Sequence, residues 1–160
     1  MLWRVERISA LPKEERRRQG EALARRMLAE YTDRPAEGFT LARTDAGKPY
    51  AANGPEFNLS HSGAFLACAV GDRPVGIDIE AVRPLKLEVA RRVCNAKEMD
   101  YLAPETPGSH IRFLRIWTAK EAYFKALGTG ITGLQSVCYF DLLPRLQQVE
   151  TEEYVLTIYQ

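Results

Sequence analysis

The stretch that decides the fold is Val75-Gly76-Ile77-Asp78-Ile79-Glu80. Its three β-branched residues alternate strictly with a glycine and two acids, which is the period-2 pattern of a half-buried strand. Residues two apart on a strand share a face and lie roughly 6.6 Å apart. We therefore expect Asp78 and Glu80 to project together, away from an aliphatic core. The alternative is that they form the ordinary solvated face of an edge strand.

A second informative segment is Trp117-Thr118-Ala119-Lys120-Glu121-Ala122-Tyr123-Phe124-Lys125. It lies in a predicted helix over residues 111–127, where apolar residues recur at helical spacing and Gly128 follows as a stop. Glu121 and Lys125 share one face, and taken alone they would be a surface ion pair worth about 0.3–0.5 kcal/mol. Combined with the two strand acids, they indicate a site for a hard divalent cation and a phosphate-bearing substrate, which need oxygen ligands and ammonium groups respectively.

Composition limits the classes of protein. A chain of 160 residues fits one compact domain, or two small halves that share a core. Its formal net charge of +1 argues against a nucleic-acid partner. Cys68, Cys94 and Cys138 show no metal-ligand spacing and cannot all pair, which predicts reduced thiols. The N-terminus is charged where a signal peptide is apolar, and no run could span a bilayer, so we expect a cytoplasmic protein without membrane contact.

The remaining pattern mixes strands and helices without βαβ alternation, which favours an α+β fold. Strands are expected at residues 2–8 and 39–43, and a helix from residue 12 to about 30. Residues 47–63 are rich in Gly, Pro and Asn and are predicted to form a loop. The other predicted elements are a hairpin of residues 64–70 and 75–80, helices over 85–94 and 96–103, and a closing antiparallel pair of residues 136–140 and 153–159.

Within the predicted loop, two features bear on chemistry. Lys48 lies between two turn-forming residues, and it is either a rigidly presented phosphate ligand or part of a common exposed turn. Ser60 and His61 place a hydroxyl beside an imidazole, yet the spacing of a hydrolase nucleophile is absent. We prefer phosphate or nucleotide contact for this pair. The alternative is a loop whose serines satisfy local backbone groups.

Two charged features keep two explanations each. Arg16-Arg17-Arg18 lies in the first predicted helix and is either a solvated face or a phosphate contact. Asn95 and Glu98 have nearly the spacing of a capping box, so Glu98 either closes a helix N-terminus or serves chemistry.

Four segments in this order resemble the 4′-phosphopantetheinyl transferases: 47–49, 57–63, 75–80 and 117–125. Within that family the chain is similar to the larger, pseudo-dimeric type, which activates peptide and polyketide synthetases and fatty-acid carriers. The resemblance implies two similar α/β halves with antiparallel strands packed on helices and a pseudo-twofold axis. We accordingly expect one compact domain over residues 1–160, made of halves of about 1–75 and 76–160.

The resemblance also implies a reaction and a set of site residues. The reaction is magnesium-dependent transfer of the phosphopantetheine arm of coenzyme A to a serine of an apo acyl, peptidyl or polyketide carrier protein, with release of adenosine 3′,5′-bisphosphate. Manganese is a second candidate metal, and a monomer is expected. By position, the metal ligands are Asp78, Glu80 and Glu121, the catalytic residues are Lys125, Glu98 and Glu121, and the coenzyme A contacts are Arg16, Lys48, Ser60, His61, Lys120 and Lys125.

The chain departs from the family pattern in two places. The stretch between the first strand and the first helix is shorter, so basic residues that larger members use there have no counterpart. The segment Arg92-Val93-Cys94-Asn95 stands where aromatic residues are usual, which leaves carrier preference open. A non-catalytic coenzyme A or carrier-binding module on the same scaffold is therefore an alternative, and a serine hydrolase using Ser60 and His61 is another.

Overall fold

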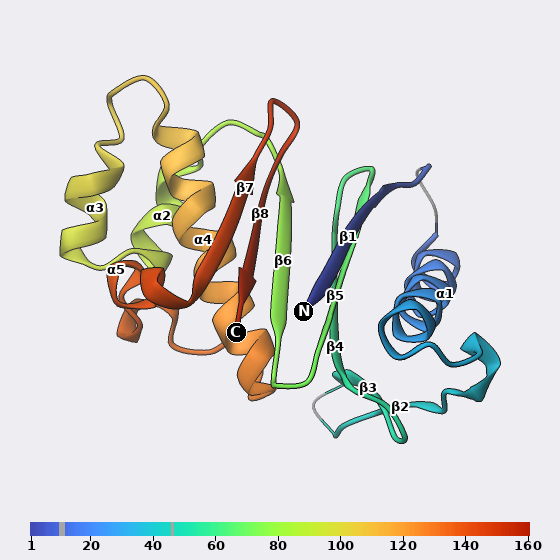
Figure 1. Ribbon diagram of the computed structural model, residues 1–160. Helices are drawn as coiled ribbons and strands as arrows, with labels where there is room; N and C mark the ends of the chain where they lie inside the picture. The colour runs from blue at the N-terminus through green and yellow to red at the C-terminus, as the bar shows by residue number, and fades with distance from the viewer. Residues whose placement is uncertain (10–11, 46) are drawn as a thin grey trace.

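The computed structural model describes residues 1–9, 12–45 and 47–160 (Figure 1). The N-terminal elements are β1 (Leu2–Arg7), α1 (Lys13–Thr32), η1 (Ala36–Gly38), β2 (Leu41–Arg43), β3 (Pro49–Ala51), β4 (Glu56–Ser62) and β5 (Phe65–Gly71). The C-terminal elements are β6 (Gly76–Ala81), α2 (Leu87–Val93), α3 (Ala96–Leu102), α4 (Ser109–Leu127), η2 (Leu134–Ser136), α5 (Tyr139–Leu142), η3 (Leu143–Arg145), β7 (Leu146–Glu150) and β8 (Tyr154–Tyr159). The predicted α+β class is confirmed.

The longer strands of the described residues form two three-stranded antiparallel sheets, ordered β1-β5-β4 and β6-β8-β7, and β2 pairs with β3 separately. The same topology occurs twice. A first strand is followed by a helix and then by a hairpin whose second strand pairs with the first, as β1, α1, β4-β5 and again as β6, α4, β7-β8. This repeat supports the proposed division into pseudo-symmetric halves of about 1–75 and 76–160, which stays a prediction.

The layers run helix, sheet, sheet, helix, with α1 on one outer face and α4 with α2 and α3 on the other (Figure 1). Strand β5 is buried along its whole length because it faces two cores. Leu66, Cys68 and Val70 pack toward α1, while alternate residues of β5 enter the core between the sheets. This explains the uninterrupted apolar run of the strand, since a strand covered on both faces does not alternate in polarity.

Strand β6 lies between the inter-sheet core and α4. Its apolar residues alternate with glycine and acids because one face meets the core and the other meets the helix. Ile77 and Ile79 enter the inter-sheet core, as the sequence predicts. Gly76 faces α4 so closely that a Cβ atom would lie 1.8 Å from the carbonyl oxygen of Ala122. Asp78 shares the face of Gly76, because residues two apart on a strand point the same way. The strand acids are thus turned toward the helix that carries Glu121.

The loop prediction for residues 47–63 is wrong, because this segment contains β3 and the seven-residue β4. Phe57 and Leu59 pack toward α1, whereas the alternate residues of β4 are polar. Their polarity obscured the strand in the sequence. It has a structural reason: these polar side chains face β6 of the other sheet, to which they hydrogen-bond.

Two predicted strand pairings are also wrong. Residues 64–70 and 75–80 are not a hairpin, since β5 pairs with β4 and β1 while β6 pairs with β8. The tight turn lies earlier, at Gly63, whose φ of +55° suits glycine. The partner of β8 is β7, and residues 136–140 contribute only parts of η2 and α5. The helix predictions at 12–30, 85–94, 96–103 and 111–127 are confirmed as α1 to α4, with small differences in their ends.

Candidate functional site

The centre of the candidate site is Asp78, which is 2% exposed on β6. Its Oδ1 atom lies 2.5 Å from Nζ of Lys125 on α4 and accepts a hydrogen bond of 2.8 Å from the hydroxyl of Ser60 on β4. Three elements from both sheets and the long helix therefore meet at one carboxylate oxygen. Burial raises the pKa of Asp78, and the Lys125 ammonium opposes that shift.

Glu121 lies one helical turn before Lys125 and joins the same cluster. Its Oε2 atom is 3.8 Å from Nζ of Lys125. Burial, and next the charge of Asp78, raise the pKa of Glu121 to about 7, and the more distant charge of Glu80 acts in the same direction. Two carboxylates so close to each other repel, which favours a proton on one of them as long as no cation compensates their charge.

Glu80 is held by different partners. Its Oε2 atom accepts a hydrogen bond of 2.8 Å from Ser62 and lies 3.2 Å from a guanidinium nitrogen of Arg83. Within the described ranges, no three Asp, Glu, His or Cys side chains are gathered closely enough to hold a metal ion as they stand. The structure thus brings Asp78 and Glu121 together and leaves Glu80 near them but engaged elsewhere.

The chemistry of this cluster nevertheless fits a hard divalent cation. Oδ2 of Asp78 is buried and has no hydrogen-bond partner among the described residues. A buried carboxylate oxygen without a partner is costly, and a bound cation would remove that cost. The neighbouring donors are carboxylate oxygens, the ligands that magnesium prefers, and magnesium keeps several waters, so it needs few protein ligands. Asp78, Glu121 and Glu80 are the side chains that would hold such an ion.

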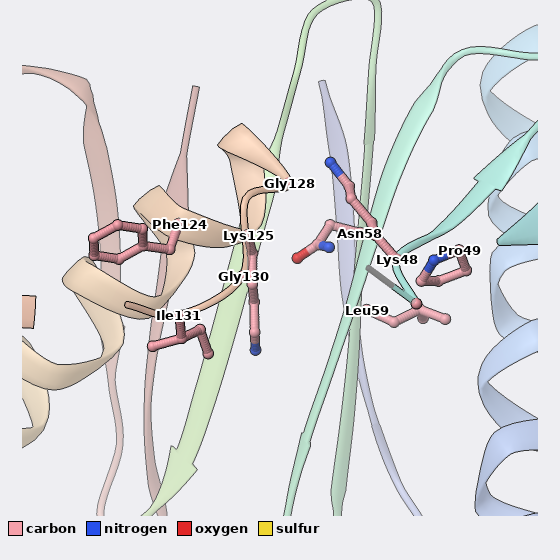
Figure 2. Close-up of a pocket in the computed structure, with 10 residues that line it drawn as sticks. Lys48, Pro49, Asn58, Leu59, Phe124, Lys125, Gly128, Gly130 and Ile131 are labelled. Carbon is pink, nitrogen blue, oxygen red and sulfur yellow. The ribbon is translucent and has the colours of Figure 1, made fainter. Parts of the chain in front are cut away.

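Beside the cluster is a pocket of about 240 Å³ between the β3–β4 region and the C-terminal end of α4 (Figure 2). Lys48 and Asn58 line it from the N-terminal side, and Phe124, Lys125 and Ile131 line it from the C-terminal side. The Lys48 ammonium lies 3.4 Å from the carbonyl oxygen of Ala126 near the end of α4, and burial lowers its pKa. Lys48 is therefore held across the pocket, and it is more than an exposed turn residue.

A second pocket, of about 300 Å³, shares Pro49 and Leu59 with the first. Its basic side chains come from α1, β2 and β4; they are Lys13, Arg16, Arg17, Arg43 and His61. Burial lowers the pKa of His61, and the positive charges of Arg16 and Lys125 add to the effect. The two pockets are thus neighbours, and the basic side chains of the second lie next to the pocket that Lys48 and Lys125 line.

Glu98 and Lys120 form a separate, fully buried ion pair. Nζ of Lys120 lies 2.6 Å from Oε2 of Glu98, and both side chains are 0% exposed. The capping box predicted for Asn95 and Glu98 is present, and the other Glu98 oxygen accepts from the backbone of Tyr139. Lys120 also donates to the carbonyl of Val93. These contacts correct the expectation that Lys120 reaches coenzyme A, and Glu98 could act as a base only if they opened.

The hydroxyl of Ser60 is fully occupied inside the protein. It donates to Asp78 and accepts from the backbone N–H of Ile79 at 3.3 Å and from Lys125 at 2.9 Å. A hydroxyl has one donor and two acceptor lone pairs, so all three are used within the protein. His61 follows it on the strand and therefore points to the opposite face. Ser60 also lines the second pocket, so its contact with coenzyme A stays a prediction, while the opposite directions of the two side chains argue against a Ser60–His61 hydrolase pair.

Sequence reasoning missed Asn58 and Ser62, which flank Ser60 on the same face of β4. Asn58 accepts from the backbone N–H of Ile77 at 2.9 Å, and Ser62 accepts from that of Ala81 at 3.1 Å. The period-2 spacing of polar residues at 58, 60 and 62 is the sequence signal that could have predicted this strand face. The prediction of a loop for residues 47–63 left that signal unused.

Comparison with known proteins agrees with this arrangement. The family model of the 4′-phosphopantetheinyl transferase superfamily matches residues 74–158, more than half of the chain. The chain belongs to the 4′-phosphopantetheinyl transferase superfamily. The match runs from β6 through α4 to β8, and so includes the acid cluster and Lys125.

Individual phosphopantetheinyl transferases are similar over most of this chain. The enzyme psf-1 of Bacillus pumilus is 40% identical over 121 residues, which are 73% of this chain and 52% of the relative. The enzyme gsp of Aneurinibacillus migulanus is 34% identical over 113 residues, 70% of this chain and 48% of the relative. HetI of Nostoc sp. is 38% identical over 136 residues, 78% and 57% respectively. The chain thus spans about half the length of the curated phosphopantetheinyl transferases it matches.

A membrane-spanning element is not found among the helices of the described residues, since none combines the necessary length with the necessary apolar character.

Proposed function

We propose that this chain transfers 4′-phosphopantetheine from coenzyme A to a serine of an apo carrier protein. The single observation that carries the proposal is the contact of Lys125 with Asp78, beside Glu121, at the pocket that Lys48 and Lys125 line. Such a constellation suits a substrate with a pyrophosphate at its centre, because anionic oxygens need both a cation and ammonium groups. Membership of the superfamily supports the same reaction class.

The pockets suggest how coenzyme A would bind. Arg16 and His61 would receive the phosphorylated ribose in the basic pocket, with Arg43 beside them. Lys48 and Lys125 would contact the pyrophosphate from opposite sides of the first pocket. The apolar side chains of Phe124 and Ile131 line the same pocket and would pack against the uncharged pantetheine arm.

The transfer step exchanges one phosphorus–oxygen bond for another. The carrier serine oxygen attacks the phosphorus that bears the pantetheine arm, and the bond to the leaving adenosine 3′,5′-bisphosphate breaks. Magnesium, or manganese in its place, held by Asp78 and Glu121 with Glu80, would neutralise negative charge on the pyrophosphate. Lys125 would give a proton to the leaving phosphate. The serine proton needs a base, and Glu98 stays a candidate only if its buried contacts open.

Acyl, peptidyl and polyketide carriers are all candidate acceptors, and a monomeric enzyme in the cytoplasm remains our expectation. The test is mass spectrometry of a panel of apo carriers incubated with coenzyme A, Mg²⁺ and this chain. We expect one carrier or more to gain the phosphopantetheine mass. Failure across the panel would contradict the proposal.

A non-catalytic coenzyme A-binding module is the alternative that the shortened stretch between the first strand and the first helix suggests, although membership of the superfamily favours the enzyme. It would bind coenzyme A with no mass gain on any carrier. Calorimetric titration with coenzyme A beside the carrier assay separates the two functions.

A further inference from the structure

The seam between the two sheets is built from side chains on one strand and backbone on the other. Strand β6 is the edge of its sheet, since its sheet order is β6-β8-β7. The backbone N–H groups of Ile77, Ile79 and Ala81 point away from β8, toward β4. An edge strand normally leaves such groups to water or to another chain.

Three polar side chains of β4 accept these three N–H groups. The pairs are Asn58 with Ile77, Ser60 with Ile79, and Ser62 with Ala81, at N–O distances of 2.9, 3.3 and 3.1 Å. Both members of the pairs advance by two residues at each step, so the row stays in register with the pleat of β6. The side chains of β4 thus take the place of a neighbouring strand's carbonyl groups.

Each serine in the row makes a second bond. Ser60 donates to Oδ1 of Asp78, and Ser62 donates to Oε2 of Glu80, both at 2.8 Å. In both cases the serine also accepts from the next backbone N–H group along β6. Asp78 precedes Ile79, whose N–H bonds to Ser60, and Glu80 precedes Ala81, whose N–H bonds to Ser62. One serine hydroxyl therefore connects the main chain of β6 to the orientation of its acid, and this happens twice with the same geometry.

We propose that Ser60 and Ser62 are positioning residues that set the orientation of the Asp78 and Glu80 carboxylates for cation binding, and that Asn58 completes the row as a register anchor. The metal part of this inference rests on the proposed function. Partners that orient metal ligands typically change metal affinity by roughly tenfold to a hundredfold when they are lost. The row also ties the acid pair to the N-terminal sheet, so the site is assembled only when the sheets are in register.

The experiment measures two quantities on the full chain: hydrogen exchange of individual backbone amides by NMR, and Mn²⁺ affinity by spin-resonance titration without coenzyme A. The variants are Asn58→Ala, Ser60→Ala, Ser62→Ala and Ser62→Thr. Ser136→Ala is the matched control, because the Ser136 hydroxyl is exposed and bonds only to the nearby carbonyl of Gly133. Thermal unfolding confirms that each variant is folded before it is compared.

We expect a one-to-one pattern of exchange. Loss of Asn58, Ser60 or Ser62 speeds exchange at Ile77, Ile79 or Ala81 respectively, and Ser136→Ala changes none of them. Mn²⁺ affinity falls about tenfold or more in Ser60→Ala and Ser62→Ala. Ser62→Thr, which keeps the hydroxyl, retains both the slow exchange of the Ala81 amide and the Mn²⁺ affinity of the parent chain.

Two results would overturn the inference. Unchanged exchange at Ile79 and Ala81 would show that the row does not hold β6. Normal Mn²⁺ affinity in both serine variants, despite faster exchange, would show that the serines do not position the acids. A parent chain that binds no Mn²⁺ while it shows the expected amide pattern would instead contradict the metal assignment of the proposed function, so the two failures are distinguishable.

Discussion

Nζ of Lys125 lies 2.5 Å from Oδ1 of Asp78, although 47 residues separate them in the sequence. The contact exists because Gly76 lets α4 lie directly on the face of β6 from which Asp78 projects. Helix α4 carries Glu121 one turn before Lys125, so the same approach delivers a second acid. The site is therefore a consequence of strand–helix packing, and loop conformation contributes little to it.

The first prediction concerns Gly76. Gly76→Ala would place a Cβ atom 1.8 Å from the carbonyl oxygen of Ala122, which is backbone and cannot turn aside. We expect a loss of about 3 kcal/mol or more in the free energy of unfolding, at the upper end of the cost of overpacking. Urea unfolding measures it. Gly38→Ala is the control, since a Cβ atom at Gly38 would meet nothing within 4 Å; equal stability of the two variants would contradict the packing argument.

The second prediction separates the arginines of α1. Arg16 lines the basic pocket and its charge reaches His61, whereas Arg17 pairs with Glu14 and Arg18 is 70% exposed. Arg16→Ala should raise the Kd for coenzyme A about tenfold or more, because a hydrogen bond to a charged group contributes about 1.5–3 kcal/mol.

Titration calorimetry of Arg16→Ala beside Arg18→Ala tests this difference. Arg18→Ala should bind as the parent does. Weaker binding in Arg18→Ala with no change in Arg16→Ala would show that Arg18 contacts the phosphate and Arg16 does not, which would contradict the prediction.

The third prediction concerns Glu98, whose contacts favour a structural role. Glu98→Ala leaves the Lys120 ammonium buried without a counter-ion and removes the helix cap. We expect a loss of roughly 3–5 kcal/mol, the usual cost of breaking a buried ion pair. Exposed Glu88 on α2 provides the control, and Glu88→Ala should change stability by less than about 0.5 kcal/mol. A Glu98→Ala chain of parent stability with no transfer activity would instead identify Glu98 as a base.

The fourth prediction is a pH dependence of metal binding. The pKa of Glu121 is raised from 4.5 to about 7, first by burial and then by Asp78. Between about pH 4.5 and 7, the folded chain without metal therefore keeps Glu121 protonated, whereas the unfolded chain has lost that proton. The free energy of unfolding consequently falls as pH rises from about 4.5 through about 7. A cation restores it by compensating the ionised acid, so Mg²⁺ should raise the melting temperature more at pH 8 than at pH 6.

Glu121→Gln should remove most of that pH dependence, because the amide does not titrate. Glu37→Gln is the control, since Glu37 is exposed on η1 and should leave the effect intact. Equal Mg²⁺ stabilisation of the parent chain at both pH values would contradict the prediction.

The sequence predicted the parts of the fold that have strong local periodicity. Helix α4 and strand β6 have clear periods, because each buries one apolar face and presents polar residues on the other. The α+β class followed from the order of such elements. Strand β4 was missed because its inward face is polar: Asn58, Ser60 and Ser62 serve the backbone of β6, and a local pattern does not reveal a partner in another sheet.

The site was predictable only to the extent that its residues have local signatures. Motif order pointed to Asp78, Glu121 and Lys125, and the structure places these three side chains together. The sequence did not reveal that Lys120 turns inward to Glu98, although it lies only one residue from Glu121. Adjacent residues on a helix point about 100° apart, and only the packing of α3 against α4 decides which lysine is buried.

The central claim is that Asp78 belongs to the transfer machinery. The most direct measurement is the rate at which an apo carrier gains the phosphopantetheine mass with the parent chain, with Asp78→Asn, and with the control Asp72→Asn, whose carboxylate is exposed and bonds to Tyr31. We predict that Asp78→Asn slows transfer about a hundredfold or more, while Asp72→Asn keeps the parent rate. A fully active Asp78→Asn chain would contradict the account.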